Sequence, residues 1–195
     1  MMVDARAGRP LPVAVIIGST REGRAGEAIA EWFAAQAGQR EDLELSILDL
    51  VDFRFPARYP DLATPSMSRF VALIGAADAF VVVTPEYNRS FPASLKQAID
   101  FAYDEWRAKP VGFVSYGCRS DGVYAVEQLR TVFTELQAVT MRDAVGFNLL
   151  DGSFADGGPP TDVDGATRAT ATMLDQLGWW GRALRDARRK HPYVA

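Results

Sequence analysis

The stretch from Ala79 to Asp100 constrains the fold of this chain more than any other. Ala79 to Val83 is a short, apolar and β-branched run, which is typical of a strand buried on both faces of a parallel sheet. A polar loop follows, and Pro92 near its end suits the first turn of a helix. Apolar side chains then recur at helical spacing, at Leu95, Ala98, Ile99 and Ala102. A strand, a polar loop and a helix in this order predict an open α/β sheet, whose ligands bind beyond the carboxyl ends of its strands.

The loop between this strand and this helix carries four candidate binding residues. They are Pro85, Glu86, Tyr87 and Asn88. Pro85 fixes the backbone and lacks an N–H donor, Tyr87 offers a flat amphipathic ring, and Asn88 both donates and accepts hydrogen bonds. Loops favour proline, asparagine and serine in general, so composition alone also fits a plain connection.

The first predicted strand, residues 12–17, runs into a second loop of this kind, residues 18–26. Apolar residues between Ala28 and Ala35 mark the helix that follows. The loop brings five candidate residues to the helix N-terminus: Ser19, Thr20, Arg21, Arg24 and Gly26. Free N–H groups, hydroxyl donors and guanidinium forks at a helix N-terminus suit a phosphate, while a plain helix cap with two solvated arginines is the alternative. The loop is neither a Walker A sequence nor a GxGxxG fingerprint, which disfavours ATP and a nicotinamide Rossmann site.

A third loop follows the predicted strand at residues 110–115. It is rich in glycine, and glycine lets the backbone approach a flat ligand closely. Its candidate residues are Ser115, Tyr116, Gly117 and Gly122. Cys118 lies in the same loop without a histidine to activate it, so we interpret it as a bystander.

The remaining pattern completes a doubly wound sheet. Residues 43–48 alternate as an edge strand does, residues 49–66 are irregular, and residues 139–147 predict the last strand. The closing helix is predicted at residues 167–189, with Met173, Leu174, Leu177, Trp180 and Leu184 facing inward. We therefore predict an α/β fold with a five-stranded parallel sheet of order 2-1-3-4-5 and helices on both faces. In that order the three loops converge on one crevice, because they follow neighbouring strands.

Composition excludes several classes of function. The chain has 195 residues, 48% of them hydrophobic, which fits one folded domain and not a disordered chain. Its net charge of −4 leaves no electrostatic footprint for nucleic acid, and no apolar run approaches the length of a membrane span. His191 is the only histidine, so we expect no metal site. Cys118 is the only cysteine, which fits a reducing compartment, and we expect a cytoplasmic protein.

The three loops resemble those of a known family. Pro-Glu-Tyr-Asn at 85–88, followed by Ser-x-Pro-x-x-Leu-Lys-x-Ala-Ile-Asp at 90–100, is similar to the signature of the NAD(P)H-dependent FMN reductases with a flavodoxin-like fold. That family includes quinone, azo-dye and chromate reductases. Gly-Ser-x-Arg at 18–21 resembles its FMN-phosphate loop, and Ser-Tyr-Gly at 115–117 resembles a loop that borders the flavin ring. Two positions depart from the family pattern: Arg24 stands where many relatives have serine, and Tyr124 where relatives often have arginine.

The resemblance implies an enzyme that binds FMN. A flavodoxin-like FMN-binding domain is expected over residues 12–195, after a flexible tail at residues 1–11 that lacks the apolar core of a secretory signal. NADPH or NADH would deliver a hydride to the flavin, which would then reduce a quinone-like or other small acceptor. Because FMN carries the redox chemistry, no catalytic side chain is predicted. Arg89 and Arg119 either pair with the NADPH 2′-phosphate or are solvated.

The sequence leaves alternatives for the oligomeric state and for the class of flavoprotein. A homodimer or homotetramer is expected, since relatives commonly assemble and Trp106, Trp179, Trp180 and the aromatic segment 53–59 exceed the needs of one small core. A flavodoxin-like electron carrier is one alternative function. A reductase that uses FMN as a diffusible substrate is another. The physiological acceptor and the choice between NADPH and NADH stay open.

Overall fold

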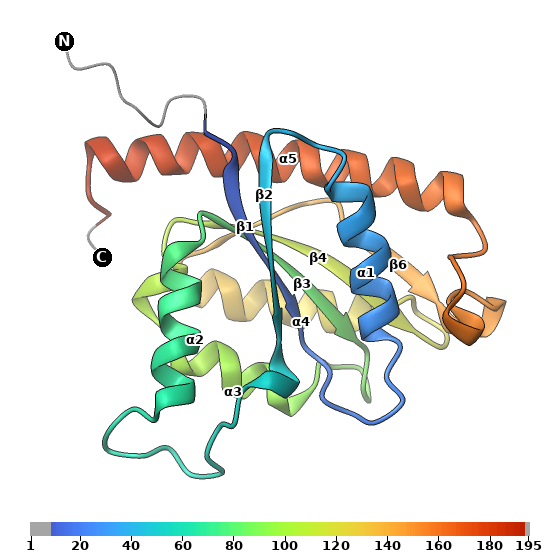
Figure 1. Cartoon of the computed structure of the whole chain (residues 1–195), viewed down its shortest axis with the longest axis horizontal. Coiled ribbons are helices and arrows are strands. Elements are labelled where there is room, and N and C mark those ends of the chain that lie inside the picture. The colour runs from blue at the N-terminus through green and yellow to red at the C-terminus, as the bar shows by residue number, and fades with distance from the viewer. Residues whose placement is uncertain (1–8, 194–195) are drawn as a thin grey trace.

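The computed structural model describes residues 9–193 and places a parallel sheet between two layers of helices (Figure 1). The strands are β1 (Leu11–Ile17), β2 (Leu43–Asp49), β3 (Ala79–Pro85), β4 (Pro110–Gly117), β5 (Val139–Thr140) and β6 (Val145–Asn148). Their order is β2-β1-β3-β4-β5, with β6 also paired to β4, and all pairs are parallel. The predicted order 2-1-3-4-5 is confirmed, and β2 lies at the edge of the sheet as expected.

The sheet has six strands and not the predicted five, because the last strand is split. β5 pairs with the start of β4, at Pro110 and Val111, and β6 pairs with its end, from Val114 to Gly117. Between β5 and β6 the chain leaves the ladder. There the guanidinium of Arg130 donates to two carbonyl oxygens, those of Met141 and Arg142. A side chain thus satisfies carbonyl groups at the point where the strand is interrupted.

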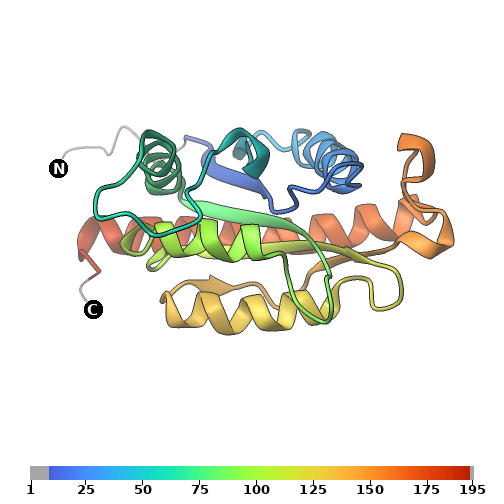
Figure 2. The same ribbon diagram turned by 90° about the horizontal axis from the view of Figure 1, so that it is seen from below.

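The helices cover both faces of the sheet. They are α1 (Gly26–Ala37), α2 (Pro65–Ala76), α3 (Ala93–Phe101), α4 (Val123–Glu135) and α5 (Val163–Lys190), with short 3₁₀ turns η1 (Leu50–Asp52), η2 (Asp104–Trp106), η3 (Leu149–Asp151) and η4 (Ala155–Gly157). α1 and α5 pack on one face, and α2, α3 and α4 on the other. In that second layer α4 lies against β4 and β5 and α2 against β1, so Figure 2 shows α4 on the far side of the molecule from α2. Residues 1–8 of the predicted tail lie outside the described residues, and Leu11 opens β1.

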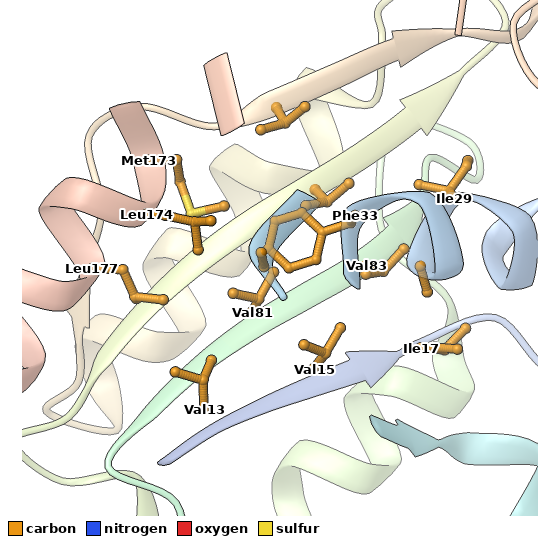
Figure 3. Close-up of a cluster of buried hydrophobic side chains, with 14 of the residues drawn as sticks. Val13, Val15, Ile17, Ile29, Phe33, Val81, Val83, Met173, Leu174 and Leu177 are labelled. Atoms are coloured by element: carbon orange, nitrogen blue, oxygen red, sulfur yellow. The ribbon is translucent and has the colours of Figure 1, made fainter. Parts of the chain in front are cut away.

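The core consists mainly of β-branched strand residues packed against helices, as the sequence pattern predicts. Figure 3 shows Val13, Val15 and Ile17 of β1 and Val81 and Val83 of β3 beneath α1 and α5. The helices contribute Ile29, Phe33, Met173, Leu174 and Leu177. All ten side chains are buried, and burial of each stabilises the fold by about 1.5–3 kcal/mol. The central strands are thereby fixed, and their carboxyl ends have little freedom to shift.

Two tryptophans differ from the sequence expectation. Trp106, which the sequence placed among the aromatics in excess of one core, lies in η2 after the end of α3 at Phe101 and is fully buried. Its indole N–H donates to the carbonyls of Ile99 and Ala102 at 3.1 and 2.8 Å, so it belongs to the core. Trp180 was expected to face inward and is 39% exposed. α5 instead packs through Gly181, where a side chain would clash with Leu11, and this turns Trp180 outward.

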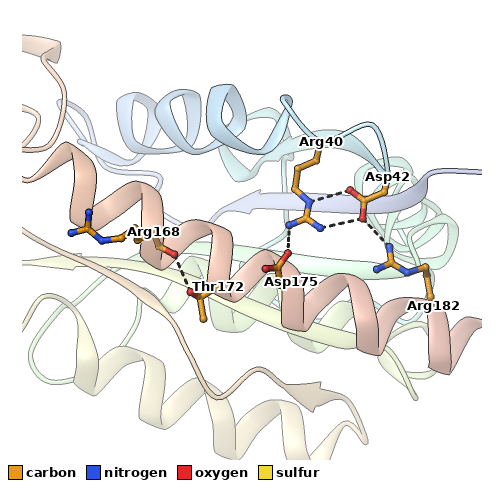
Figure 4. Close-up of polar contacts among 6 residues, drawn as sticks. All are labelled: Arg40, Asp42, Arg168, Thr172, Asp175 and Arg182. Atoms are coloured by element: carbon orange, nitrogen blue, oxygen red, sulfur yellow. Dashed lines mark hydrogen bonds and ion pairs between the residues drawn. The ribbon is translucent and has the colours of Figure 1, made fainter.

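α5 is also tied to the chain that enters β2. Arg40 contacts both Asp42 and Asp175, and Arg182 donates to Asp42 at 2.9 Å (Figure 4). Hydrogen bonds from Arg40 and Arg182 lower the pKa of Asp42 to about 2, so this carboxylate stays charged over the usual pH range.

None of the helices that the structure describes has the length and apolar character to cross a bilayer.

Candidate active site

The carboxyl ends of β1, β3 and β4 lie side by side, and the loops that follow them meet. The backbone N–H of Glu86 donates to the carbonyl of Tyr116 at 2.9 Å, which joins the second loop to the third. The hydroxyls of Ser19 and Tyr87 lie 3.1 Å apart, which joins the first loop to the second. The hydroxyl of Tyr116 packs against Gly26, which joins the third loop to the first. The sheet order therefore brings the three predicted loops into one site.

The first loop presents backbone N–H groups with no internal acceptor. Among the described residues, none of the N–H groups of residues 19–23 finds a hydrogen-bond acceptor, and no side chain caps the N-terminus of α1. Gly23 has φ of 66°, which allows the chain to turn between Arg21 and Arg24. The guanidinium of Arg21 is exposed and has no hydrogen-bond or ion-pair partner in the part of the chain that the structure describes. Free N–H groups, a helix N-terminus and an unpaired arginine together form a site for an anion.

Arg24 is oriented differently from Arg21. Its guanidinium forms a bidentate ion pair with Asp49 at the end of β2, and it also donates to the carbonyl of Ser19. The side chains of Arg24 and Asp49 are 9% and 15% exposed, so the pair is largely withdrawn from water. Hydrogen bonding to Asp49 raises the pKa of Arg24. The guanidinium of Arg24, a candidate binding residue of the sequence, thus braces the first loop against β2.

The hydroxyl of Tyr116 is buried without a hydrogen-bond partner among the described residues. Burial, with the neighbouring Tyr87, raises the pKa of Tyr116 well above its usual value, so the hydroxyl keeps its proton. A buried hydroxyl with no partner is uncommon in folded proteins. It lies beside Gly26, at the start of α1, and so at the base of the anion site.

The third loop is shaped by Gly122. Its φ is 81°, and a Cβ there would lie 2.5 Å from the Cβ of Ser115 and 2.7 Å from the backbone nitrogen of Tyr116. Only glycine fits this close approach. The hydroxyl of Ser115 is turned into the loop, where it donates to the carbonyl of Asp121 at 2.7 Å. Ser115 and Gly122 therefore set the shape of the loop, and Gly117 is left at its surface toward the site.

A cavity of about 260 Å³ lies where the three loops meet. Seven predicted residues line it: Arg21, Arg24, Pro85, Glu86, Tyr87, Tyr116 and Gly117. Asn88 lines the next cavity, and Thr20 lines a third one beside Phe53 and Phe55. Ser19, Gly26, Ser115 and Gly122 line none of these cavities and lie buried behind the loops. Sequence reasoning did not name five residues of this lining, Glu22, Gly23, Ala25, Cys118 and Leu149, nor Asp49 behind Arg24. Leu149 directly follows β6 and Asp49 is the last residue of β2, and a position at the carboxyl end of a strand was the signal that could have identified these two.

The parallel sheet of order 2-1-3-4-5 with a crevice beyond strands β1, β3 and β4 defines a flavodoxin-like protein. The sequence model for NADPH-dependent FMN reductases matches residues 11–149. The chain therefore belongs to the NADPH-dependent FMN reductase family.

Individual relatives agree with this family. The chain is 34% identical over 119 residues to an NAD(P)H-dependent FMN reductase of Schizosaccharomyces pombe, which covers 56% of this chain and 60% of that protein. It is 28% identical to a 2-hydroxy-1,4-benzoquinone reductase of a Burkholderia species, over 90% of this chain and 98% of that protein. FerB of Paracoccus denitrificans, a flavoenzyme NAD(P)H:(acceptor) oxidoreductase, has a similar structure with a TM-score of 0.73 and 27% identity, over 88% of this chain and 98% of that chain. The match spans between 59% and 65% of the length of three fungal FMN reductases.

Proposed function

We propose that the chain is an FMN-containing oxidoreductase that transfers electrons from NAD(P)H to a quinone-like small molecule. The observation that carries this proposal is the convergence of an anion site and a cavity walled by Tyr87 and Tyr116 at one edge of the sheet. The relatives named as FMN reductase, benzoquinone reductase and flavoenzyme oxidoreductase support it. In the overall reaction NAD(P)H would be oxidised to NAD(P)⁺, and the quinone would take up the hydride equivalent and one proton from solvent to become a hydroquinone.

The residues present fit FMN. The unpartnered hydroxyl of Tyr116, the free N–H groups of residues 19–23 and the unpaired fork of Arg21 are donors, which is the chemistry that a phosphate and a ribityl chain require. Gly117 and the ring of Tyr87 offer flat surfaces to a heterocycle. FMN, when bound, supplies the hydride-accepting and electron-donating chemistry.

The side chains of the site would then bind FMN and orient it. Arg21, Thr20 and the first loop would hold the phosphate, and Glu86 to Asn88 together with Tyr116 and Gly117 would hold the ring. Glu86 is fixed for this purpose, because its carboxylate accepts from the hydroxyl of Ser120 at 2.7 Å and from the backbone N–H of Tyr124 at 3.1 Å. With one open crevice, donor and acceptor would bind in turn at the same place.

This function predicts a specific kinetic result. The flavin absorbance of desalted protein should bleach after anaerobic stopped-flow mixing with NADPH or NADH, and a quinone should restore it. Initial-rate plots against donor and acceptor should be parallel, because each excludes the other from the crevice. Protein that carries FMN yet is bleached by neither nucleotide would be a flavodoxin-like electron carrier. Protein that is colourless after desalting but reduces added FMN would be a reductase with FMN as diffusible substrate.

We further propose that the chain forms a homodimer. Trp179 and Trp180 stack edge to face on α5 and are 62% and 39% exposed, and Tyr59 and Leu62 are exposed near the start of α2. Each of these two places exposes large apolar side chains, and exposed apolar patches mark interfaces. Light scattering at micromolar concentration should therefore give twice the chain mass of 21.4 kDa. A monomer mass would contradict the proposal, and four times the chain mass would indicate a homotetramer.

A cytoplasmic location and a single FMN-binding domain over residues 12–195 complete this proposal. The thiol of Cys118 is exposed and unpaired, which suits a reducing compartment where disulfides do not persist. The two helical layers share one sheet, which supports a single unit.

A further inference from the structure

A second cavity, of about 460 Å³, adjoins the proposed flavin cavity. The two share Glu86 and Cys118 in their walls. The second cavity lies between the turn after β3 and the loop that leads into α4, and its lining includes two arginines, Arg89 and Arg119. A ligand bound over the flavin cavity therefore has room to extend toward these arginines.

The charges in this second cavity are unbalanced. Arg89 and Arg119 are both exposed, and neither has an ion-pair partner within the described residues. Glu86 is the only acidic residue in the lining, and its carboxylate already accepts two hydrogen bonds, from Ser120 and Tyr124. The cavity lining thus contains two guanidinium groups with free donors and only one carboxylate, which already accepts two hydrogen bonds. This arrangement favours an incoming oxyanion, since arginine binds phosphate with two parallel hydrogen bonds.

Arg89 is held in place by its backbone. Residues 87–90 form a tight turn in which Tyr87 and Ser90 exchange both backbone hydrogen bonds, at 2.7 and 2.9 Å. Asn88 and Arg89 occupy its two central positions with φ of 51° and 67°. Glycine is preferred at the second of these positions, so arginine there is a strained choice, and strain of this kind concentrates at functional sites.

The side chain and carbonyl of Arg89 are held by α4. Its guanidinium lies over the ring of Tyr124, with 4.0 Å from its central carbon to the ring centroid. Gln128 donates to the carbonyl of Arg89 at 2.9 Å and accepts from the hydroxyl of Ser90 at 2.5 Å. Stacking uses the face of the guanidinium and leaves the N–H donors along its edge available, and Arg89 lines the second cavity.

We propose that Arg89 and Arg119 form an oxyanion subsite beside the flavin cavity and that the 2′-phosphate of NADPH occupies it. The inference rests on the proposed function, because it assigns the specificity of the same site. It makes NADPH the preferred donor over NADH. The phosphate would replace the water around two unpaired guanidinium groups, and a donor without it would leave them unpaired.

The test uses the substitution Arg89→Gly with Arg119→Gln. Glycine suits the positive φ at position 89, so Arg89→Gly removes the charge while relieving strain in the turn. The matched control is Arg142→Gln, an exposed arginine between β5 and β6 that lines neither cavity. Calorimetry measures binding of adenosine 2′,5′-bisphosphate and of adenosine 5′-monophosphate, and stopped-flow measures flavin bleaching by NADPH and NADH.

The double variant should bind adenosine 2′,5′-bisphosphate about 10- to 100-fold more weakly and lose a similar factor with NADPH. The affinity for adenosine 5′-monophosphate, the rate with NADH and both readouts of the control variant should change less than about threefold.

Equal losses with NADPH and NADH would overturn the proposal. A loss confined to negatively charged acceptors, in the half-reaction that reoxidises the flavin, would also overturn it by assigning the subsite to the acceptor. The calorimetric measurement needs no turnover, so it tests the subsite without the reaction. If wild type binds the bisphosphate selectively but its flavin is not bleached by either nucleotide, the proposed function fails and the subsite stands. If the double variant does not fold, Arg89→Gly alone decides, since its turn favours glycine.

Discussion

Replacing Arg21 by alanine is expected to weaken FMN binding by about 1.5–3 kcal/mol, which is roughly a 10- to 150-fold rise in the dissociation constant. Arg21 lines the flavin cavity, and its guanidinium has no partner among the described residues. Its donors are therefore available to a phosphate at no cost to the fold. Quenching of FMN fluorescence on titration with protein measures the change.

The phosphate dependence of this loss makes the prediction specific. Riboflavin lacks the phosphate, so its affinity should be the same in wild type and Arg21→Ala. Arg168→Ala serves as a matched control, because Arg168 is an exposed arginine on α5 that lines none of the cavities at the site. The thermal midpoint should not change in either variant. Equal FMN affinity of wild type and Arg21→Ala would remove Arg21 from the site, and equal losses of FMN and riboflavin would show that the variant acts on loop shape.

The sheet and the meeting of the three loops could be predicted because both depend on local patterns. The runs ending at Ile17, Val83 and Ser115 are apolar and β-branched enough to require burial on both faces, and parallel strands of this kind are ordered by their helical connections. Once the order is fixed, the loops after β1, β3 and β4 have to share one edge. The fold therefore follows from patterns that are local in the sequence.

What could not be predicted depends on contacts between distant parts of the chain. Nothing near Arg24 indicates whether its guanidinium faces a phosphate or the interior, because its partner Asp49 is 25 residues away. The split of the last strand depends on Arg130 of α4, and the outward turn of Trp180 depends on Leu11 against Gly181. Each of these outcomes is decided by a contact between different elements of the fold, and a periodic pattern carries no such information.

The ion pair between Arg24 and Asp49 gives the largest expected effect on stability. Asp49→Asn should lower the free energy of unfolding by about 2–4 kcal/mol, because it leaves the mostly buried guanidinium of Arg24 without a counter-ion. For a chain of this size that corresponds to a fall of about 4–16 °C in the thermal midpoint. The matched control is Asp100→Asn, which breaks the exposed pair with Lys96 and should change the midpoint by about 1–2 °C at most. Calorimetry or thermal circular dichroism measures both.

A double replacement separates the charge from the packing. Arg24→Met with Asp49→Leu removes both charges and should recover most of the lost stability, since apolar side chains of similar size replace buried ion pairs at little cost. FMN affinity should nevertheless be lower in the double variant than in wild type, because the carbonyl of Ser19 loses the donor that braces the first loop. If Arg24 instead binds the phosphate, Asp49→Asn would free its guanidinium, and FMN affinity would rise in that variant while it fell in Arg24→Met. Arg24 is thus expected to act through the shape of the loop, and the sign of the FMN response to Asp49→Asn decides between the two roles.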